Sequence, residues 1–232
     1  MGIAPARSVL TASVCLALLA GAAPVGADNP SSVSSYYLAR GDPRMCPSPQ
    51  CGGLWVRLVN RDTTTCGDGR TARECYVASA DLSRLDIGDA TRATLTSQIS
   101  AGRVLVRGMI VGGRVSGFPQ LDTLVASEGW RASSSAHPPS GVFRRLRDNS
   151  RRCIAAPCFS IHAATLNTAG QVELSQVNLA GTGAPVAEQR KALARITTGE
   201  LIAAGKVVRR PNAGPAGAGR ELVASQFYVR VG

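Results

Sequence analysis

The chain has 232 residues, with 26 Lys and Arg against 15 Asp and Glu, and a formal net charge of +11. Arginine supplies nearly all of this basicity, because Lys191 and Lys206 are the only lysines. A GC-rich genome produces such a composition by itself, and a polyanionic partner would also favour it. Charge alone therefore identifies no partner. The sequence also has one apolar run, near its N-terminus, which is too short and too rich in alanine for a permanent transmembrane helix.

That apolar run lies in an N-terminal segment with the pattern of a signal peptide. Arg7 provides the positive charge, Val9–Leu19 is small and apolar throughout, and Val25 and Ala27 place small residues before a cleavage point. We expect residues 1–27 to be a signal peptide cleaved near Ala27, so that the mature chain begins at Asp28 and is secreted or periplasmic.

Cys15 raises the question of a lipid anchor. A lipoprotein cysteine normally follows a small residue, whereas Val14 precedes Cys15 and the apolar run continues beyond it. We therefore expect Cys15 to be part of the leader and the mature protein to have no lipid anchor and no transmembrane span.

The rest of the chain repeats itself, which indicates duplication. RMCPSPQCGGLWVRLVN begins at Arg44 and RRCIAAPCFSIHAATLN begins at Arg151, each with two cysteines five positions apart and an asparagine nine positions later. Tyr36 and Arg40 correspond to Phe143 and Arg147 at the same offset of 107. Downstream the offset falls to 97, with these matches: Leu82 and Leu179, Ile99 and Ile196, Gly102 and Gly199, Gly108 and Gly205, and finally LVASEGW and LVASQFY, one residue further displaced.

Each copy predicts strands around one helix. In the first, segments 36–40, 54–60 and 76–80 have strand composition, a helix runs from Asp89 to Gly102, and strands follow at 104–111 and 123–130. In the second, the helix opens at Pro185 and ends before Gly199. The predicted fold is a β-rich α+β class of two tandem β-β-β-α-β-β units, resembling small OB-like barrels, with an open α+β sheet as the alternative. The expected boundaries are 34–131 for the first repeat, 132–140 for a linker and 141–232 for the second repeat.

Six cysteines remain after the leader, an even number that predicts disulfides in an exported protein. The second copy lacks about ten residues, the length of the Cys66–Cys75 loop, and loses both cysteines with it. Loss of a whole loop is simplest if its cysteines bond to each other. We therefore predict Cys46–Cys51, Cys66–Cys75 and Cys153–Cys158. A zinc site is the sharper alternative, but the spacings are looser than those of zinc knuckles and the second copy could not form it.

The sequence offers little for catalysis. His137 lies in the linker, and His162 lies where the first copy has Trp55, which favours a packing or surface position over a general base. The chain has no nucleophile-elbow serine, phosphate loop or HExxH motif, and Asp86 and Asp89 are explained by helix capping. We expect no cofactor and no metal, and we regard an enzyme as the weaker hypothesis.

The strongest charge feature is a group of five arginines at the start of the second copy: Arg144, Arg145, Arg147, Arg151 and Arg152. Residues 141–232 hold 13 basic and 5 acidic residues, against 12 and 9 in residues 34–131. Strand alternation places Arg145 and Arg147 on one face and Arg144 on the other. The group could bind a polyanion or could simply be a solvated edge strand protected by its charge.

The run CPSPQCGG, followed by VN, CGDG, CYVASADLS and LVASEGW, resembles an uncharacterised family of exported bacterial domains of unknown function. The second copy lacks the Gly-Gly pair and the Cys66–Cys75 loop, so it is similar to a degenerate member. The resemblance implies no activity, substrate or site residue.

Three hypotheses for function follow. The leading one is a non-catalytic exported binding or structural module that contacts anionic envelope material. The second is an envelope-acting hydrolase with its site between the repeats, and the third is an inhibitor or partner-binding protein. Expected partners are an anionic envelope polymer or another exported protein, whereas export argues against nucleic acid.

Overall fold

A computed structural model of the chain describes residues 1–2 and 33–232. The predicted signal peptide, with Cys15 and the cleavage point at Ala27, lies outside the described residues. Within the described ranges, no helix has both the length and the apolar character needed to cross a membrane.

The described chain forms one large, mainly antiparallel β-sheet of 12 strands. Ten of them lie side by side in the order β11-β10-β9-β13-β14-β8-β7-β1-β2-β5. The other two, β6 and β12, pair in parallel with β8 and β14, respectively. The strands are β1 (Ser35–Gly41), β2 (Leu54–Leu58), β5 (Cys75–Val77), β6 (Ser79–Asp81), β7 (Val104–Val111), β8 (Thr123–Ala132), β9 (Val142–Asp148), β10 (Ile161–Thr165), β11 (Gln171–Leu174), β12 (Gln176–Asn178), β13 (Leu201–Arg210) and β14 (Gly219–Val231). A separate small hairpin consists of β3 (Thr64–Thr65) and β4 (Thr71–Ala72).

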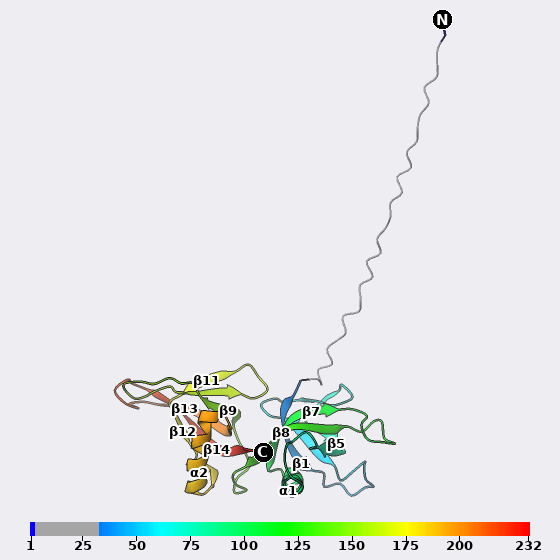
Figure 1. Cartoon of the computed structure of the whole chain (residues 1–232), viewed down its shortest axis with the longest axis horizontal. Coiled ribbons are helices and arrows are strands. Elements are labelled where there is room, and N and C mark those ends of the chain that lie inside the picture. The colour runs from blue at the N-terminus through cyan, green and yellow to red at the C-terminus, as the bar shows by residue number, and fades with distance from the viewer. Residues whose placement is uncertain (3–32) are drawn as a thin grey trace.

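The expectation of OB-like barrels is wrong, and the open α+β alternative describes the fold. The reason is a strand pairing that no local pattern reveals: the end of β14, Tyr228–Val231, pairs with the end of β8, Gly129–Ala132. Further along the same two strands, β8 pairs with β6 and β14 pairs with β12 within each half. In Figure 1 the strands β9–β14 gather at the left, β1–β8 at the right, and the C-terminus lies between them.

The helices lie close to where the sequence predicts them. Helix α1 (Asp89–Ser100) begins at Asp89 with Gly88 as its N-cap, and Gly102 after it has a positive φ of 72°. Helix α2 (Val186–Ala194) follows Pro185 and the 3₁₀ turn η2 (Ala180–Thr182), and it continues into the 3₁₀ turn η3 (Arg195–Thr198). Each helix buries few side chains: Leu95 and Ile99 in α1, and Ala192 in α2.

The buried side chains form three clusters. One lies between α1 and the first half of the sheet, and a second lies between α2 with η3 and the second half. The third cluster joins the two halves, because its aromatic members Tyr36 and Trp130 come from the first half and Phe143 and Tyr228 from the second. All four of these side chains are less than a tenth exposed, so burying them favours keeping the halves together.

Two asparagines bridge this third cluster in a reciprocal manner. The side chain of Asn60 accepts from the Phe143 N–H at 2.9 Å and donates to the carbonyls of Phe143 and Leu166 at 2.9 and 3.0 Å. The side chain of Asn167 accepts from the Tyr36 N–H at 2.8 Å and donates to the carbonyls of Tyr36 and Val59 at 2.8 and 3.0 Å.

Both asparagines adopt left-handed backbone conformations, with φ of 57° for Asn60 and 58° for Asn167. Asparagine tolerates this region better than most side chains, so the same residue type suits both the turn and the bridge. Strands β1 and β9 lie on either side of the four strands β13-β14-β8-β7, and no strand pairing joins β1 to β9 in the described sheet. The two asparagine side chains therefore hold them near each other.

The segment predicted to be a linker is also fixed. Ala132 belongs to β8, and beyond it the Ser133 hydroxyl donates to Gln226 Oε1 at 2.6 Å. Gln226 Nε2 in turn donates to the Ser134 carbonyl at 2.8 Å. Residues 133–140 thus follow the surface of the second half from β8 to β9.

Replacing Asn60 by aspartate tests the bridge. Asn60→Asp keeps the acceptor for Phe143 N–H but removes both donations. The Leu166 carbonyl loses this donor, and the Phe143 carbonyl keeps only the Leu166 N–H at 3.1 Å, so we expect the free energy of unfolding to fall by about 1–3 kcal/mol. Urea unfolding measures this change. Asn212→Asp is the matched control, because exposed Asn212 has the same φ of 57°; equal losses in the two variants would contradict the bridge.

Candidate functional site

The five arginines predicted to bind polyanions do not form one surface. Arg144 points to the opposite face of β9 from Arg145 and Arg147, and its Nε is buried without a hydrogen-bond partner. Burial also lowers the pKa of Arg144. Arg151 and Arg152 are exposed beyond the end of β9, where Arg152 pairs with Asp148 at 2.8 Å.

Arg145 and Arg147 instead line a hollow of about 540 Å³ together with His162. Strand pairing creates this grouping, because Arg147 on β9 lies directly opposite His162 on β10, and Arg145 lies opposite Ala164. The small Ala164 side chain leaves space between the two polar pairs. The turn Thr197–Gly199 at the end of η3 forms the facing wall.

Arg145 is fixed in position by the interior. Its Nε donates to the Gly199 carbonyl at 2.8 Å, and its Nη1 lies 3.4 Å from the Tyr36 hydroxyl. The guanidinium carbon also lies 5.3 Å from the centroid of the Trp130 ring, a cation–π distance. These contacts therefore fix the position of the Arg145 guanidinium at the inner side of the hollow.

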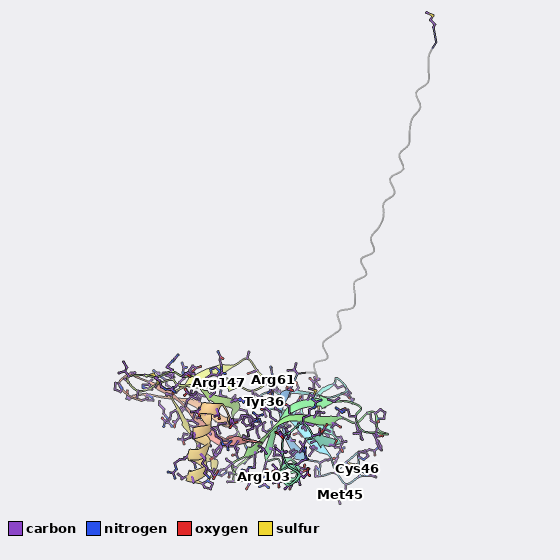
Figure 2. The ribbon with its side chains drawn as sticks, viewed as in Figure 1. Tyr36, Met45, Cys46, Arg61, Arg103 and Arg147 are labelled. Carbon is purple, nitrogen blue, oxygen red and sulfur yellow. A yellow bond between two sulfur atoms is a disulfide. The ribbon has the colours of Figure 1, made fainter. Side chains whose placement is uncertain are left out.

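Arg147 differs because it is exposed and, among the residues described, forms no ion pair or side-chain hydrogen bond. It lies at the mouth of the hollow and can be found by its label in Figure 2. A guanidinium that is always charged and has five donors is well suited to an oxyanion.

His162 is oriented by a chain of polar contacts that extends across three strands. Its Nδ1 lies 2.7 Å from Oε1 of Glu173 on β11, the residue directly opposite it in the sheet. Asn149 Nδ2 donates to the other oxygen, Oε2, of Glu173. The pKa of Glu173 is lowered, chiefly by the hydrogen bond from His162. Burial opposes this effect, and the hydrogen bond from Asn149 lowers the pKa further. The carboxylate thus stays ionised and fixes the imidazole, whose side chain is 15% exposed.

The sequence interpretation of His162 as a packing or surface residue missed this grouping. Its match with Trp55 favoured packing, and no pattern pointed to Glu173. The available signal was strand alternation, which already placed Arg145 and Arg147 on one face. The missing information was the pairing register that brings His162 beside Arg147 and Glu173 beside His162.

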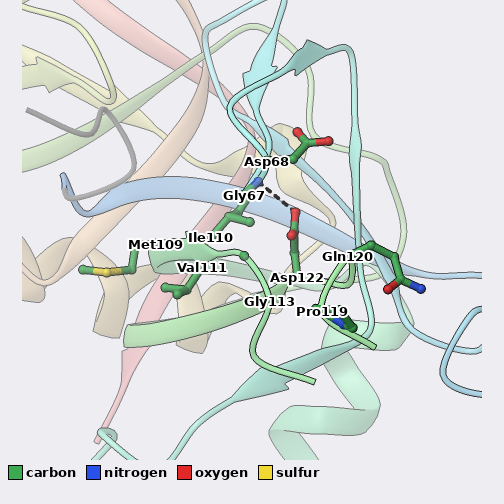
Figure 3. Close-up of a pocket in the computed structure, with 10 residues that line it drawn as sticks. Gly67, Asp68, Met109, Ile110, Val111, Gly113, Pro119, Gln120 and Asp122 are labelled. Carbon is green, nitrogen blue, oxygen red and sulfur yellow. Dashed lines mark hydrogen bonds between the residues drawn. The ribbon is translucent and has the colours of Figure 1, made fainter. Parts of the chain in front are cut away.

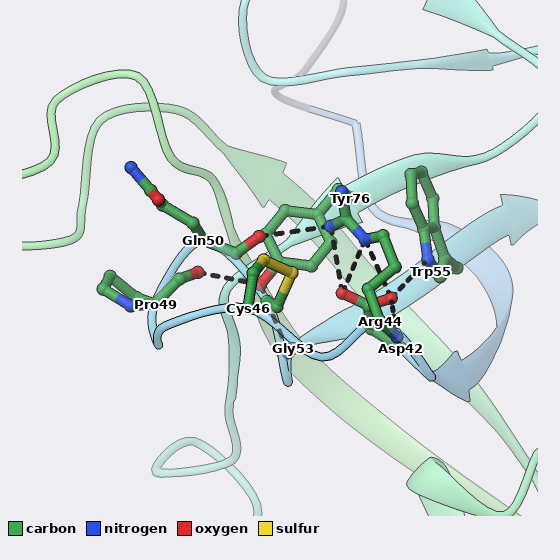
Figure 4. A network of polar contacts seen from close by, with 9 residues as sticks. Asp42, Arg44, Cys46, Pro49, Gln50, Gly53, Trp55 and Tyr76 are labelled. Carbon is green, nitrogen blue, oxygen red and sulfur yellow. Dashed lines mark hydrogen bonds and ion pairs between the residues drawn. A yellow bond between two sulfur atoms is a disulfide. The ribbon is translucent and has the colours of Figure 1, made fainter.

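In the first half, three side chains that lie opposite one another on neighbouring strands are packed and leave no hollow between them. Arg40, Trp55 and Tyr76 lie opposite one another on β1, β2 and β5. Arg44 covers the two aromatic rings, with its guanidinium carbon 5.0 Å from the Trp55 centroid and 4.8 Å from that of Tyr76 (Figure 4). Asp42 accepts from Arg44 and from Trp55 Nε1 at 3.1 Å.

The Arg44 hydrogen bonds lower the pKa of Asp42 to about 2. Gln50 and Pro49 in the Cys46–Cys51 loop join the same network, since Arg44 donates to the Gln50 carbonyl and the Tyr76 hydroxyl donates to the Pro49 carbonyl. The charged groups of Asp42 and Arg44 are paired with each other within the chain, so we interpret this cluster as a structural support for the disulfide loop.

The structure contains the three disulfides that the sequence predicts: Cys46–Cys51, Cys66–Cys75 and Cys153–Cys158. Because Cys66 bonds to Cys75, neither thiolate is free for a metal. One large apolar side chain is exposed at each of the two six-residue disulfide loops: Met45 lies directly before the Cys46–Cys51 loop, and Ile154 lies within the Cys153–Cys158 loop. Met45 projects beside Cys46 at the lower edge of Figure 2, but single exposed apolar residues are common and identify no partner.

A second cleft, of about 500 Å³, lies beside the Cys66–Cys75 loop (Figure 3). Asp122, 7% exposed, accepts from the Gly67 N–H at 2.8 Å. Gly67 is required here because a Cβ would lie 2.6 Å from the Asp122 carboxyl group. Burial raises the pKa of Asp122, the Gly67 hydrogen bond opposes the rise and nearby Asp68 adds to it. We interpret Asp122 as the anchor of the loop.

This anchoring role predicts opposite effects for two substitutions. Because the pKa of Asp122 is raised by folding, its ionised form costs stability above the unfolded-state pKa of about 3.9 and costs none below it. Asp122→Asn keeps an acceptor and removes the charge, so at neutral pH it should be at least as stable as the wild type. Asp122→Ala loses the acceptor and should cost about 1–3 kcal/mol.

Thermal unfolding at neutral pH and at about pH 3 measures both effects. Any advantage of Asp122→Asn should disappear at the lower pH, where Asp122 is protonated in both states. Equal destabilisation by the two substitutions at neutral pH would show that the charge itself is needed and would contradict the anchor.

A third hollow, of about 420 Å³, lies between the halves, where the sequence-based alternative placed an enzyme site. Its charged lining residues are Arg103, Arg131 and Glu188, and three serines, Ser133, Ser134 and Ser135, also line it. His137 lies close by, because a Cβ built at the lining residue Gly183 would stand 3.8 Å from His137 Cδ2 and 3.3 Å from Ser134 Oγ.

The comparisons with known proteins give a family and no more. Residues 35–232 match the family described as a domain of unknown function, DUF6748, and the chain therefore belongs to this family as a single domain that includes both halves. No curated protein and no solved structure matches the chain.

Proposed function

We propose that this DUF6748 protein is a non-catalytic, exported module that binds an anionic envelope polymer through the hollow between Arg145, Arg147 and His162. The observation that carries the proposal is the meeting of two arginines and an oriented histidine in one hollow of about 540 Å³. Arg145 and His162 are held by contacts within the chain, so of the three side chains only that of Arg147 must be ordered when the anion binds.

The arginines have different roles in this proposal. Arg147 is exposed and without a protein partner in the described structure, so it makes the first contact with the anion. Arg145 offers its remaining guanidinium donors at the inner side. Arg151 and Arg152 extend the positive potential along the rim, although Asp148 offsets the charge of Arg152. Arg144 plays no part, because it faces the other side of β9.

Export is supported by the cysteine chemistry together with the leader pattern. Three disulfides within one chain favour an oxidising compartment, where thiols do not return to the reduced state. An extracytoplasmic location would also give the basic hollow access to anionic envelope material.

We further propose that the domain arose by internal duplication. Support comes from strand registers that coincide at the sequence offsets of 107 and 97, and of 98 for the match of Leu124 with Leu222. The corresponding pairs are Arg40–Trp55 with Arg147–His162, Trp55–Tyr76 with His162–Glu173, Leu38–Leu105 with Arg145–Ile202, and Ala80–Leu124 with Val177–Leu222. Register shifts also follow Arg107 and Ala204, which are 97 residues apart.

Retention on immobilised heparin in a salt gradient tests the binding proposal. Arg147→Gln should elute at clearly lower salt than the wild type, because it removes the one free guanidinium at the hollow. Arg84→Gln makes the same change of charge at an exposed site in the first half and is the matched control. Identical elution of the two variants would mean that only net charge matters and would contradict a site at this hollow.

A further inference from the structure

We infer that His162 is the third anion ligand of this hollow and takes up a proton when an oxyanion binds, so that binding strengthens as the pH falls. This inference rests on the proposed function, since it assigns a proton-linked mechanism to the same site. It starts from the hydrogen bond between His162 and Glu173.

The contact with Glu173 fixes which nitrogen of His162 can meet a ligand. An ionised carboxylate only accepts hydrogen bonds, so Nδ1 must carry a proton to donate across the 2.7 Å to Glu173 Oε1. In the neutral imidazole the other nitrogen, Nε2, then has a lone pair and no proton. An oxyanion also presents only lone pairs, so it can bind to Nε2 only after that nitrogen is protonated.

The charges around His162 favour this coupling. On β9, the cations Arg145 and Arg147 oppose a further positive charge while the hollow is empty. On β11, Glu173 favours the imidazolium, and Asn149 holds that carboxylate in place. An anion that binds to the arginines offsets their repulsion and so allows the imidazole to become charged.

The other elements around the hollow do not alter this balance. Asp148 on β9 also lines it, but its carboxylate is already paired with Arg152 at 2.8 Å. Arg151 is exposed near Glu173 and lowers the pKa of that carboxyl further. Thr197 and Thr198 on η3 are uncharged, and their hydroxyls donate to carbonyls of the preceding turn at 2.9 and 3.0 Å.

The same position in the first half shows what the hollow requires. There Trp55 and Tyr76 take the places of His162 and Glu173, and their rings are covered by Arg44 of the chain itself. The residue opposite Leu38 is Arg57, where the second half has Ala164 opposite Arg145. The combination of a small residue, a carboxylate-held histidine and two arginines occurs only in the second half of the described sheet.

Titration of the full mature protein with sulfate, followed by NMR, tests the inference. Sulfate stays fully ionised across the range used, and chloride keeps the ionic strength constant. Shifts of the His162 ring signal give the dissociation constant at about pH 5.5 and about pH 8, on either side of the usual histidine range. We expect binding about tenfold tighter at the lower pH, the effect of one added charge–charge contact of about 1.4 kcal/mol.

His137 is an internal control, because it is exposed in the segment between β8 and β9 and should not respond in a saturable way. His162→Gln keeps a donor for Glu173 but cannot be charged. Its sulfate affinity, followed like that of the wild type through the backbone amide signals of β9 and β10, should be weak and independent of pH. Arg147→Gln should weaken binding at both values.

The outcomes separate the inference from the proposed function. Sulfate binding that needs Arg147 but does not change with pH would overturn the proton uptake and leave the anion site in place. Full pH dependence retained in His162→Gln would overturn the role of His162 in the same way. Equal, unsaturable shifts of His137 and His162 at both pH values would overturn both proposals.

Discussion

The constraint on which the rest of the structure depends is the reciprocal bridge made by Asn60 and Asn167. Each side chain satisfies the N–H and carbonyl of one residue at the start of an outer strand in the opposite half, Phe143 on β9 and Tyr36 on β1. The N–H groups of Phe143 and Tyr36 would otherwise lack a partner and cost free energy, whereas their carbonyls also accept from the Leu166 and Val59 N–H groups. The bridge therefore links the starts of β9 and β1 across the third core cluster, where no strand pairing joins them in the described sheet.

The candidate site is a consequence of that arrangement. Tyr36, held by Asn167, places its hydroxyl near Arg145, and Trp130 from the same cluster lies under the Arg145 guanidinium. Residues of the first half thus hold Arg145 in position, although all the residues that line the hollow belong to the second half. A change that loosens the bridge should disturb Arg145 before it disturbs Arg147, which projects freely from β9.

The two halves differ in how the side chains on their outer strands are arranged. In the first half, Trp55 and Tyr76 bury apolar surface, and Arg44 completes the cluster together with Asp42. In the second half, smaller and more polar side chains leave a hollow. The positive excess of residues 141–232 is consistent with this difference, but three of the five clustered arginines do not line the hollow.

Sequence reasoning predicted the features that depend on local pattern. The disulfide pairs followed from a loop that is present in one half and absent from the other, and the helix starting at Asp89 followed from Gly88 and Gly102 as boundaries. The recurring asparagine was also visible, although its reach into the other half was not, because that contact joins residues more than 80 positions apart.

The errors have a common physical cause. Barrel closure depends on which strand edges pair, and the pairing of β8 with β14 is decided by long-range packing of Trp130 and Tyr228 rather than by composition. The neighbours of His162 could not be predicted for the same reason, since they come from two other strands. Strand alternation alone correctly separated Arg144 from Arg145 and Arg147.

The central claim is that the two halves form one cooperative structure, and two-probe equilibrium unfolding in urea tests it most directly. Both tryptophans, Trp55 and Trp130, lie in the first half and report its unfolding by fluorescence, whereas the ring signal of His162 reports the second half by NMR. The account predicts that the two transitions have the same midpoint and the same slope. Two separated transitions would show that the halves fold independently and would contradict it.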